Sequence, residues 1–320
     1  MRAHGLAGLD GTSVVVEVPA SSANLGAGYD CLGVALAMTN RIEIEVRVRN
    51  GGGIELTVDG EGRNELNADR ENRFVRGLEA ALRMAHGELP DEVGWRIGMR
   101  NQIPLARGLG SSAAATVGGL LAGNALAGEP LSTPELLRLA TEIEGHPDNA
   151  AAVLLGGFVV SAATAEGVEA IRFDAPRDLL AVLFIPELRL STREMRAALP
   201  ATVPLADAVA NLGAVAVGVA GLASGRLDLL GRLTVDRLHE PYRAVVYPQL
   251  PAMVAAAREA GALGACLSGA GSTILAFTDS AAGSARLEAA LMAAAVTAEL
   301  AGRVRVVELR NAGARVVAQA

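Results

Sequence analysis

The chain has 320 residues and a formal net charge of −7, and all 28 of its Lys and Arg positions hold arginine. The acidic balance argues against a broad nucleic-acid surface, and the missing lysine excludes both a conventional phosphate loop and Schiff-base chemistry. The length predicts two domains. We expect a cytoplasmic location, and no membrane partner, because the apolar stretches 212–223 and 289–301 are too short to span a bilayer.

Alternating apolar and polar residues predict strands at 14–18, 42–48, 54–58 and 95–99. Pro19 is expected to end the first strand, and the glycines at 51–53 predict an antiparallel meander. Helices are predicted from 71 to 86, closed by Gly87, and from 111 to 127, closed by Gly128. A capping box at Ser132 begins a third helix that ends near Gly145.

A composition break follows the apolar stretch 158–163, because charges and Pro176 interrupt residues 165–177 before the next apolar stretch, 180–185. We place a domain boundary there, giving domains of 1–170 and 171–320. The second half contains short strand patterns at 266–268, 273–277 and 304–309, separated by helices. The fold class is therefore α+β.

Three glycine-rich loops carry the chemistry. Residues 103–115 read IPLARGLGSSAAA, where Gly108 and Gly110 free the backbone to approach phosphate oxygens and the helix beginning at Ser111 directs its positive end toward them. A bound triphosphate would also require a Mg²⁺ ion. Mg²⁺ prefers oxygen ligands, so a serine hydroxyl and a carboxylate would complete its coordination shell. For Ser111 a simple helix-capping role is equally open. Residues 19–30 (PASSANLGAGYD) and 267–273 (LSGAGST) are the other two loops.

With these motifs in this order, the chain resembles the superfamily of galactokinase, homoserine kinase, mevalonate kinase and phosphomevalonate kinase (GHMP), over nearly its whole length. Residues 144–149 (EGHPDN) and 239–243 (HEPYR) favour the homoserine kinase family within it. Three residues depart from the family pattern: Ala27 and Ser272 replace prolines, and Tyr29 replaces phenylalanine. The resemblance implies an amino-terminal mixed sheet with helices and a carboxyl-terminal ferredoxin-like domain.

The resemblance also implies that the second loop wraps the phosphates of ATP, with Ser112 and Glu144 as ligands of Mg²⁺. For Glu144, a solvated glutamate beside Glu142 is the alternative. The residues implied in nucleotide binding are Pro104, Leu105, Ala106, Arg107, Gly108, Leu109, Gly110, Ser111, Ser112, Ala113 and Ala114.

At the other end of the site, the resemblance assigns Asn24 and Asp30 to the amino-acid substrate, with the aspartate suited to an α-ammonium group. Arg196 and Arg243 would hold the α-carboxylate, since a guanidinium pairs with two oxygens at once. Arg196 thus belongs to both the catalytic and the substrate-binding set.

Asn149 stands where related kinases carry an aspartate base, and an amide cannot accept a proton at neutral pH. Phosphoryl transfer depends mainly on positioning and charge neutralisation, so a base-free mechanism is expected, with Asn149 as a catalytic positioning residue. Asp148 remains the alternative base, and His146 is expected to be a structural loop histidine.

The predicted activity is ATP-dependent phosphorylation of the side-chain hydroxyl of L-homoserine to O-phospho-L-homoserine, a step of threonine biosynthesis. Another GHMP kinase acting on an isoprenoid precursor, or a catalytically silent nucleotide or amino-acid sensor, are the alternatives. The sequence leaves open whether the chain forms a homodimer.

Overall fold

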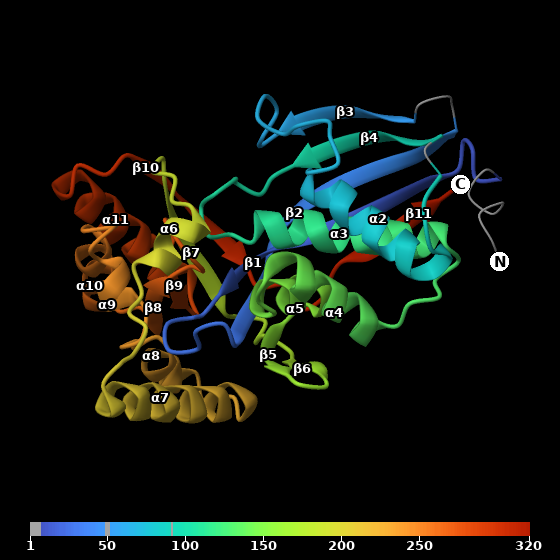
Figure 1. The fold of residues 1–320 in the computed structure, drawn as a ribbon. Helices are drawn as coiled ribbons and strands as arrows, with labels where there is room; N and C mark the ends of the chain where they lie inside the picture. The colour runs from blue at the N-terminus through green and yellow to red at the C-terminus, as the bar shows by residue number, and fades with distance from the viewer. Residues whose placement is uncertain (1–7, 49–51, 91) are drawn as a thin grey trace.

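A computed structural model describes residues 8–48, 52–90 and 92–320. Two sheets lie side by side (Figure 1). The first has seven strands with the path β11-β1-β2-β4-β3, and β5 and β6 extend it from β2. Its strands are β1 (Ser13–Ala23), β2 (Leu32–Val48), β3 (Gly53–Gly60), β4 (Val93–Asn101), β5 (Phe158–Thr164), β6 (Gly167–Phe173) and β11 (Arg315–Gln319).

Four helices pack together against this sheet (Figure 1). They are α2 (Arg73–His86), α3 (Ser111–Leu126), α4 (Thr133–Glu144) and α5 (Asp148–Leu155). Glycines let α2 and α3 approach closely, since a Cβ on Gly119 would lie 2.0 Å from the carbonyl oxygen of Phe74. This close approach holds α3, and therefore the loop before it, in a fixed position.

The second sheet confirms the predicted ferredoxin-like domain. Its order is β10-β7-β9-β8 and all its pairs are antiparallel. Helix α10 directly precedes β8 in the chain, and helix α11 joins β9 to β10. These elements are β7 (Leu180–Pro186), α10 (Leu250–Glu259), β8 (Gly264–Leu267), β9 (Ile274–Thr278), α11 (Ala281–Thr297) and β10 (Gly302–Glu308).

The long connection between β7 and α10 holds the remaining short elements and one long helix. They are α6 (Thr192–Ala197), α7 (Leu205–Ala223), the 3₁₀ turn η1 (Leu227–Leu229), α8 (Leu230–Leu233) and α9 (Glu240–Arg243). Several predicted elements are confirmed, among them α3, the capping box of α4 and the end of α2 at Gly87.

Two predictions about strands are wrong. Pro19 does not end β1, which continues to Ala23 across a register shift beside the proline. The pairing with β11 stops at Glu17, so the missing N–H of Pro19 costs no hydrogen bond on that side. The meander is also absent among the described residues, because β3 pairs with β4 and runs parallel to it.

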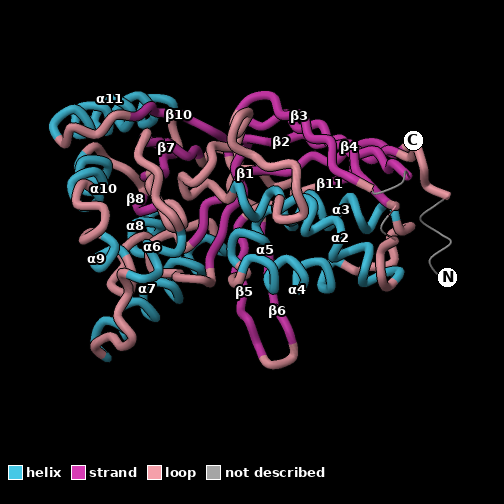
Figure 2. Tube along the Cα trace, turned by 45° about the horizontal axis from the view of Figure 1, so that its top comes forward, coloured by secondary structure: helices cyan, strands magenta, loops and turns pink. Residues whose placement is uncertain are grey.

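The composition break at 165–177 is a hairpin. β6 pairs with β5 and extends away from the rest of the first sheet (Figure 2). Its exposed residues are Glu169, Ile171 and Arg172. The division between residues 170 and 171 stays a prediction, although β11, at the end of the chain, returns to the first sheet.

The expectation that the apolar stretch 212–223 is too short to span a bilayer is wrong, because this stretch is part of a longer helix. Helix α7 begins at residue 205 rather than 212, and its 19 residues are long and apolar enough to cross a membrane by length and composition. Core helices of soluble proteins pass the same test, so this is weak evidence for a span.

Candidate active site

The three glycine loops interlock through hydrogen bonds. The Gly269 N–H donates to Ala23 O at 3.0 Å, and the Thr273 N–H donates to Arg107 O at 3.1 Å. The Ser268 hydroxyl donates to Gly108 O at 2.7 Å. A Cβ on Gly108 would lie 2.1 Å from Ser268 O, so only glycine permits this approach. Segments 240 residues apart in sequence thus form one site.

The second loop ends at the amino terminus of α3. Gly110 caps the helix in the left-handed conformation with φ of 70°, and the first helical backbone bond runs from Ala114 N to Gly110 O. The N–H groups of Ser111, Ser112 and Ala113 therefore have no intrahelical partner and lie at the mouth of a pocket. Free N–H groups at a helix start form a binding site for an anion such as phosphate.

The pocket contains most of the predicted nucleotide-binding residues. Residues 106–113 line it. Pro104 and Leu105 instead border a neighbouring cavity beside Pro186, and Ala114 is fully buried in the core. The structure therefore brings residues 106–113 of the predicted set together at the pocket, whereas Pro104, Leu105 and Ala114 lie outside its lining.

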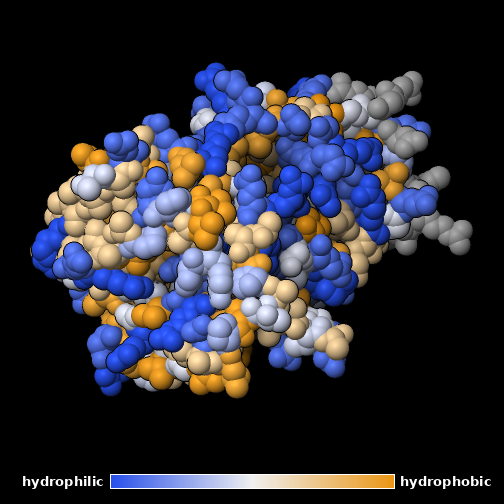
Figure 3. All heavy atoms as spheres, turned by 60° about the vertical axis from the view of Figure 1, so that its left-hand side comes forward, coloured by the Kyte–Doolittle hydropathy of each residue, from blue (hydrophilic) through white to orange (hydrophobic). Residues whose placement is uncertain are grey.

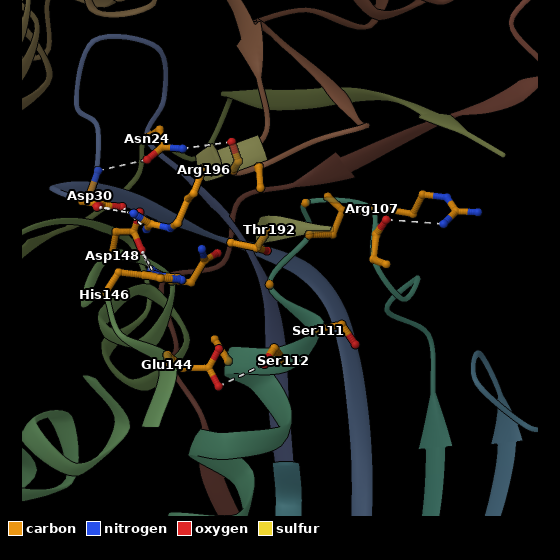
Figure 4. A pocket seen from close by; sticks show the side chains of 18 of the residues that line it. Asn24, Asp30, Arg107, Ser111, Ser112, Glu144, His146, Asp148, Thr192 and Arg196 are labelled. Carbon is orange, nitrogen blue, oxygen red and sulfur yellow. Dashed lines mark hydrogen bonds and ion pairs between the residues drawn. The ribbon is translucent and has the colours of Figure 1, made fainter. Parts of the chain in front are cut away.

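Arg107, the cation of this loop, does not direct its charge at the pocket. Its Nε donates to Pro186 O at 2.6 Å and its Nη2 to Glu187 O at 2.7 Å, at the end of β7. Its guanidinium group points away from Asp30 and Glu144 (Figure 4). Burial lowers the pKa of the Arg107 guanidinium. The side chain fastens the loop to the second domain and does not take the place of the absent phosphate-loop lysine.

Ser112 and Glu144 lie together at the phosphate end, as predicted. The Ser112 hydroxyl donates to Glu144 Oε1 at 3.0 Å (Figure 4), and the Glu144 side chain is only 5% exposed. Sequence reasoning missed two partners of this carboxylate. The Thr116 hydroxyl donates to it at 2.6 Å, and Arg73 Nη1 lies 3.7 Å away.

This hydroxyl and carboxylate fit a magnesium ion. Mg²⁺ takes one or two protein oxygens and completes its shell with water and phosphate oxygens. Ser112 Oγ and Glu144 Oε1 offer such a pair beside the free N–H groups of α3. The α4 capping box and the close packing of α3 hold the two side chains in place.

The opposite end of the pocket holds the predicted amino-acid ligands, but two of them are paired with each other. Arg196 forms a two-pronged ion pair with Asp30, at 2.9 Å and 2.5 Å (Figure 4). Asn24 Nδ2 donates to Gly269 O at 2.9 Å, and Asn24 Oδ1 accepts the N–H of Asp30 at 3.0 Å. Asn24 therefore joins the first loop to the third and holds the backbone of Asp30.

Tyr29 connects the two predicted arginines. The centre of its ring lies 5.4 Å from the guanidinium carbon of Arg196 and 5.4 Å from that of Arg243. The Tyr29 hydroxyl also accepts a hydrogen bond from Arg196 Nη1 at 2.6 Å. The departure from the phenylalanine of the family pattern thus adds a polar contact.

Arg243 is buried, with 1% of its surface exposed. Its Nη1 donates to His239 Nδ1 and to Gly269 O, both at 3.0 Å. Within the described part of the chain, no carboxylate lies at ion-pair distance from it. Burial lowers the pKa of Arg243. A buried guanidinium without an anionic partner, lining a pocket, is suited to an anionic ligand.

His239 is a residue whose role the sequence did not reveal. Its Nε2 lies 2.8 Å from Gly26 O, while its Nδ1 accepts from Arg243. Burial lowers the pKa of His239 to about 4, despite the nearby Asp236 carboxylate. The ring is therefore neutral at pH 7, with the proton on Nε2, and it links the first loop to Arg243.

Between the two ends lie His146, Asp148 and Asn149. His146 Nδ1 and Asp148 Oδ1 are 2.7 Å apart, and the carboxylate is buried. Burial lowers the pKa of His146, but the hydrogen bond and charge of Asp148 outweigh burial and raise it. Asn149 Oδ1 accepts the Ser21 hydroxyl at 2.8 Å, so this amide fastens the first loop beside Gly110.

Comparison with known proteins identifies the family. Residues 72–157 match the GHMP kinases N terminal domain, and residues 219–296 match the GHMP kinases C terminal domain. The homoserine kinase of Moorella thermoacetica is 47% identical over 82% of this chain and 86% of its own. The chain belongs to the homoserine kinase family. The homoserine kinase of Synechococcus sp. strain CC9605 is 42% identical over 95% of both chains.

A solved structure is also similar to this chain. The homoserine kinase of Cytophaga hutchinsonii superposes with a TM-score of 0.83 at 31% identity, over 95% of this chain and 97% of its own. Leishmania (L. major) mevalonate kinase, at 17% identity and a TM-score of 0.68 over 93% and 96% of the two chains, shares the fold. The predicted superfamily and family are thereby confirmed.

Proposed function

We propose that this protein transfers the γ-phosphoryl group of ATP to the side-chain hydroxyl of L-homoserine and releases O-phospho-L-homoserine and ADP. One observation carries the proposal. A single pocket has a phosphate-binding helix terminus and the Ser112–Glu144 pair at one end, and a buried Arg243 facing an ion-paired Asp30 at the other. An amino acid with a hydroxyl side chain fits between these two ends.

At the phosphate end, the N–H groups at the start of α3 would hold phosphate oxygens, and Ser112 and Glu144 would hold Mg²⁺. The ion, when bound, neutralises charge on the transferring phosphoryl group. Thr116 and Arg73 contact this carboxylate and would fix the orientation of Glu144.

At the amino-acid end, Arg243 would pair with the α-carboxylate, because it is buried and carries an unmatched charge. Asp30 would face the α-ammonium group. Arg196, already bound to Asp30, would hold that carboxylate in place and reach the substrate carboxylate with its remaining donors. This division modifies the equal clamp expected from the sequence.

The proton of the homoserine hydroxyl would pass to the phosphate itself. Asn149 cannot accept it, and Asp148 Oδ1 is already held by His146 and by the Asn149 N–H at 2.7 Å. Positioning contributes much of the barrier lowering in phosphoryl transfer, so a pocket that aligns the hydroxyl with the γ-phosphate is sufficient.

A coupled assay of ADP release with homoserine, mevalonate, galactose and shikimate tests the proposal. Homoserine should give the highest kcat/KM. A preference for mevalonate, which has a carboxylate but no ammonium group for Asp30, would favour an isoprenoid kinase. Nucleotide binding without ADP release from any substrate would favour a sensor.

A further inference from the structure

The second domain has a cleft of its own, between α10 and residues 236–241, which lead into α9. This α10 cleft has a volume of about 510 Å³, and its lining residues differ from those of the active-site pocket. Figure 1 places α9 beside α10, and Figure 3 brings this side of the molecule forward, where hydrophobic and hydrophilic side chains lie next to each other. Pockets for small organic ligands typically measure about 300–1,000 Å³, so the α10 cleft can hold one.

The α10 cleft has an apolar end and a charged end. Leu250, Pro251 and Val254 supply apolar surface at the beginning of α10, and Leu250 and Val254 are only 2% and 5% exposed. Arg258 and Glu259 lie at the other end of the helix. Two helical turns, about 12 Å along the axis, separate Leu250 from Arg258. This arrangement suits an amphipathic ligand that has a charged head and an apolar tail.

The charged end of the cleft is acidic. The carboxyl groups of Asp236, Glu240 and Glu259 line the cleft, against one guanidinium, that of Arg258. Arg258 Nη2 donates to Thr234 O at 2.8 Å, which holds this end of α10 beside the segment before α9. The carboxyl terminus of a helix also carries negative partial charge. The head group that this end favours is therefore a cation.

Glu240 is the carboxyl group that can bind such a head. The carboxylate of Asp236 already accepts four hydrogen bonds, from Asn211 Nδ2 and from the N–H groups of residues 238–240, at 2.6–3.0 Å. Glu240 Oε1 accepts the Leu267 N–H at 2.6 Å, but among the residues that the structure describes Glu240 Oε2 has no hydrogen-bond or ion-pair partner. A cation on Oε2 would therefore meet an unmatched acceptor.

We propose that the α10 cleft binds an alkylammonium ion, with the ammonium group on Glu240 and the alkyl tail along Leu250 and Val254, and that this ion strengthens homoserine binding at Arg243. Glu240 and Arg243 lie one turn apart on α9, the first at the cleft and the second at the active-site pocket. The charge of Arg243 lowers the pKa of Glu240, so the two groups interact. An ammonium ion cancels the charge of ionised Glu240 and leaves that of Arg243 for a substrate carboxylate. The effect on homoserine rests on the proposed function, whereas the binding does not.

Titration calorimetry with n-pentylammonium at pH 8 tests the binding. n-Pentanol, which has the same tail without the charge, should bind at least about tenfold more weakly, and so should methylammonium, which lacks four CH₂ groups of the tail. Ala255→Trp should abolish binding, because Ala255 lines the cleft and the indole would fill it. Ala252→Trp is the matched control, since Ala252 is exposed on the same helix but lies outside the cleft lining. Equal binding of pentanol, or full binding to a folded Ala255→Trp, would overturn the proposal.

The active site offers a competing position for an ammonium group at Asp30. Bound n-pentylammonium that homoserine displaces, and that Ala255→Trp still binds, would place the ion there and overturn the proposal. At pH 8, saturating n-pentylammonium should lower the KM for homoserine in wild type and in Ala252→Trp, but not in Ala255→Trp, and should leave the KM for ATP constant. An unchanged KM for homoserine, with the ion bound in the cleft, would overturn the link to Arg243. Failure of the proposed function would appear separately, as absence of turnover without the ion.

Discussion

The two ends of the pocket consist of different chemical groups. The phosphate end consists mainly of backbone, with free N–H groups at the start of α3 and glycines at 108 and 110. The amino-acid end consists of charged side chains from three distant segments, Asp30, Arg196 and Arg243. On the proposed function, the first end would bind the nucleotide and the second would select the acceptor. Variants at the two ends should therefore affect different substrates.

The largest effect is expected at the phosphate end. Ser112→Ala removes one proposed oxygen ligand of Mg²⁺, and Glu144→Gln removes the negative charge of the other, so kcat should fall by about 10²-fold or more, as when a preorganised electrostatic contact is lost. Steady-state kinetics over a range of Mg²⁺ concentrations measures this. Ser111→Ala is the comparison variant: if it loses more activity than a folded Ser112→Ala, the metal role belongs to Ser111.

At the amino-acid end, Arg243→Lys should raise the KM for homoserine by about 10- to 100-fold, because a hydrogen bond to a charged group is worth about 1.5–3 kcal/mol. Lysine keeps the charge but loses the planar fork. Arg196→Lys should cost less, since that side chain is already bound to Asp30. The KM for ATP should change little in both. An equal loss of affinity for both substrates would place these arginines at the nucleotide.

These two ends also differ in how far the sequence predicted them. The start of α3 at Ser111 and the glycine loop before it were predicted correctly, because they are local features of one segment. Thr116, Arg73 and His239 were missed, since each enters the site only through the packing of separate elements. The pairing of Arg196 with Asp30 could not be foreseen for the same reason.

The fold shows the same limit. Periodicity located β4, α2 and α3, but the parallel pairing of β3 with β4 and the return of β11 to the first sheet depend on contacts distant in sequence. β6 was missed because Glu169 and Arg172 interrupt its apolar residues, although Val168, Ala170 and Phe173 pack against the core.

A buried carboxylate behind the third glycine loop predicts a pH effect on stability. Burial raises the pKa of Glu240 to about 7, against 4.5 in a solvated chain, and Glu240 Oε1 accepts the Leu267 N–H at 2.6 Å. Between pH 4.5 and 7 the folded protein keeps a proton that the unfolded chain has lost, so this group makes stability fall as pH rises.

Glu240→Gln removes that titration while retaining an oxygen that can accept the hydrogen bond. The unfolding free energy of Glu240→Gln minus that of wild type should be higher at pH 8 than at pH 4.5 by at least about 1.4 kcal/mol, the equivalent of one pKa unit. Urea unfolding at both pH values measures the difference. His239 titrates oppositely in the same range, but it is present in both proteins and cancels. A difference independent of pH would mean that Glu240 is ionised in the fold.

Tyr29→Phe should have a smaller effect that is confined to the amino-acid end. It removes the hydroxyl bonded to Arg196 and keeps the ring between the two guanidinium groups. The KM for homoserine should rise about two- to tenfold, as for one ordinary hydrogen bond, and the KM for ATP should stay constant. A loss above a hundredfold would mean that the hydroxyl contacts the substrate directly.

Asp148→Asn and His146→Ala should change the rate least. A general base typically contributes about 10²–10⁴-fold, and the base-free mechanism predicts that folded variants keep most of their activity. Single-turnover phosphoryl transfer against pH, with thermal melts to check folding, separates the two cases. A thousandfold loss in Asp148→Asn, together with the loss of a titration seen in wild type, would identify Asp148 as the base.

The most direct measurement of the central claim is ³¹P NMR of the wild-type protein with Mg²⁺, ATP and one equivalent of L-homoserine. We expect one phosphomonoester signal, identical to that of added O-phospho-L-homoserine, growing in step with ADP. ADP formed with inorganic phosphate alone, or a phosphomonoester that forms without homoserine, would contradict the account.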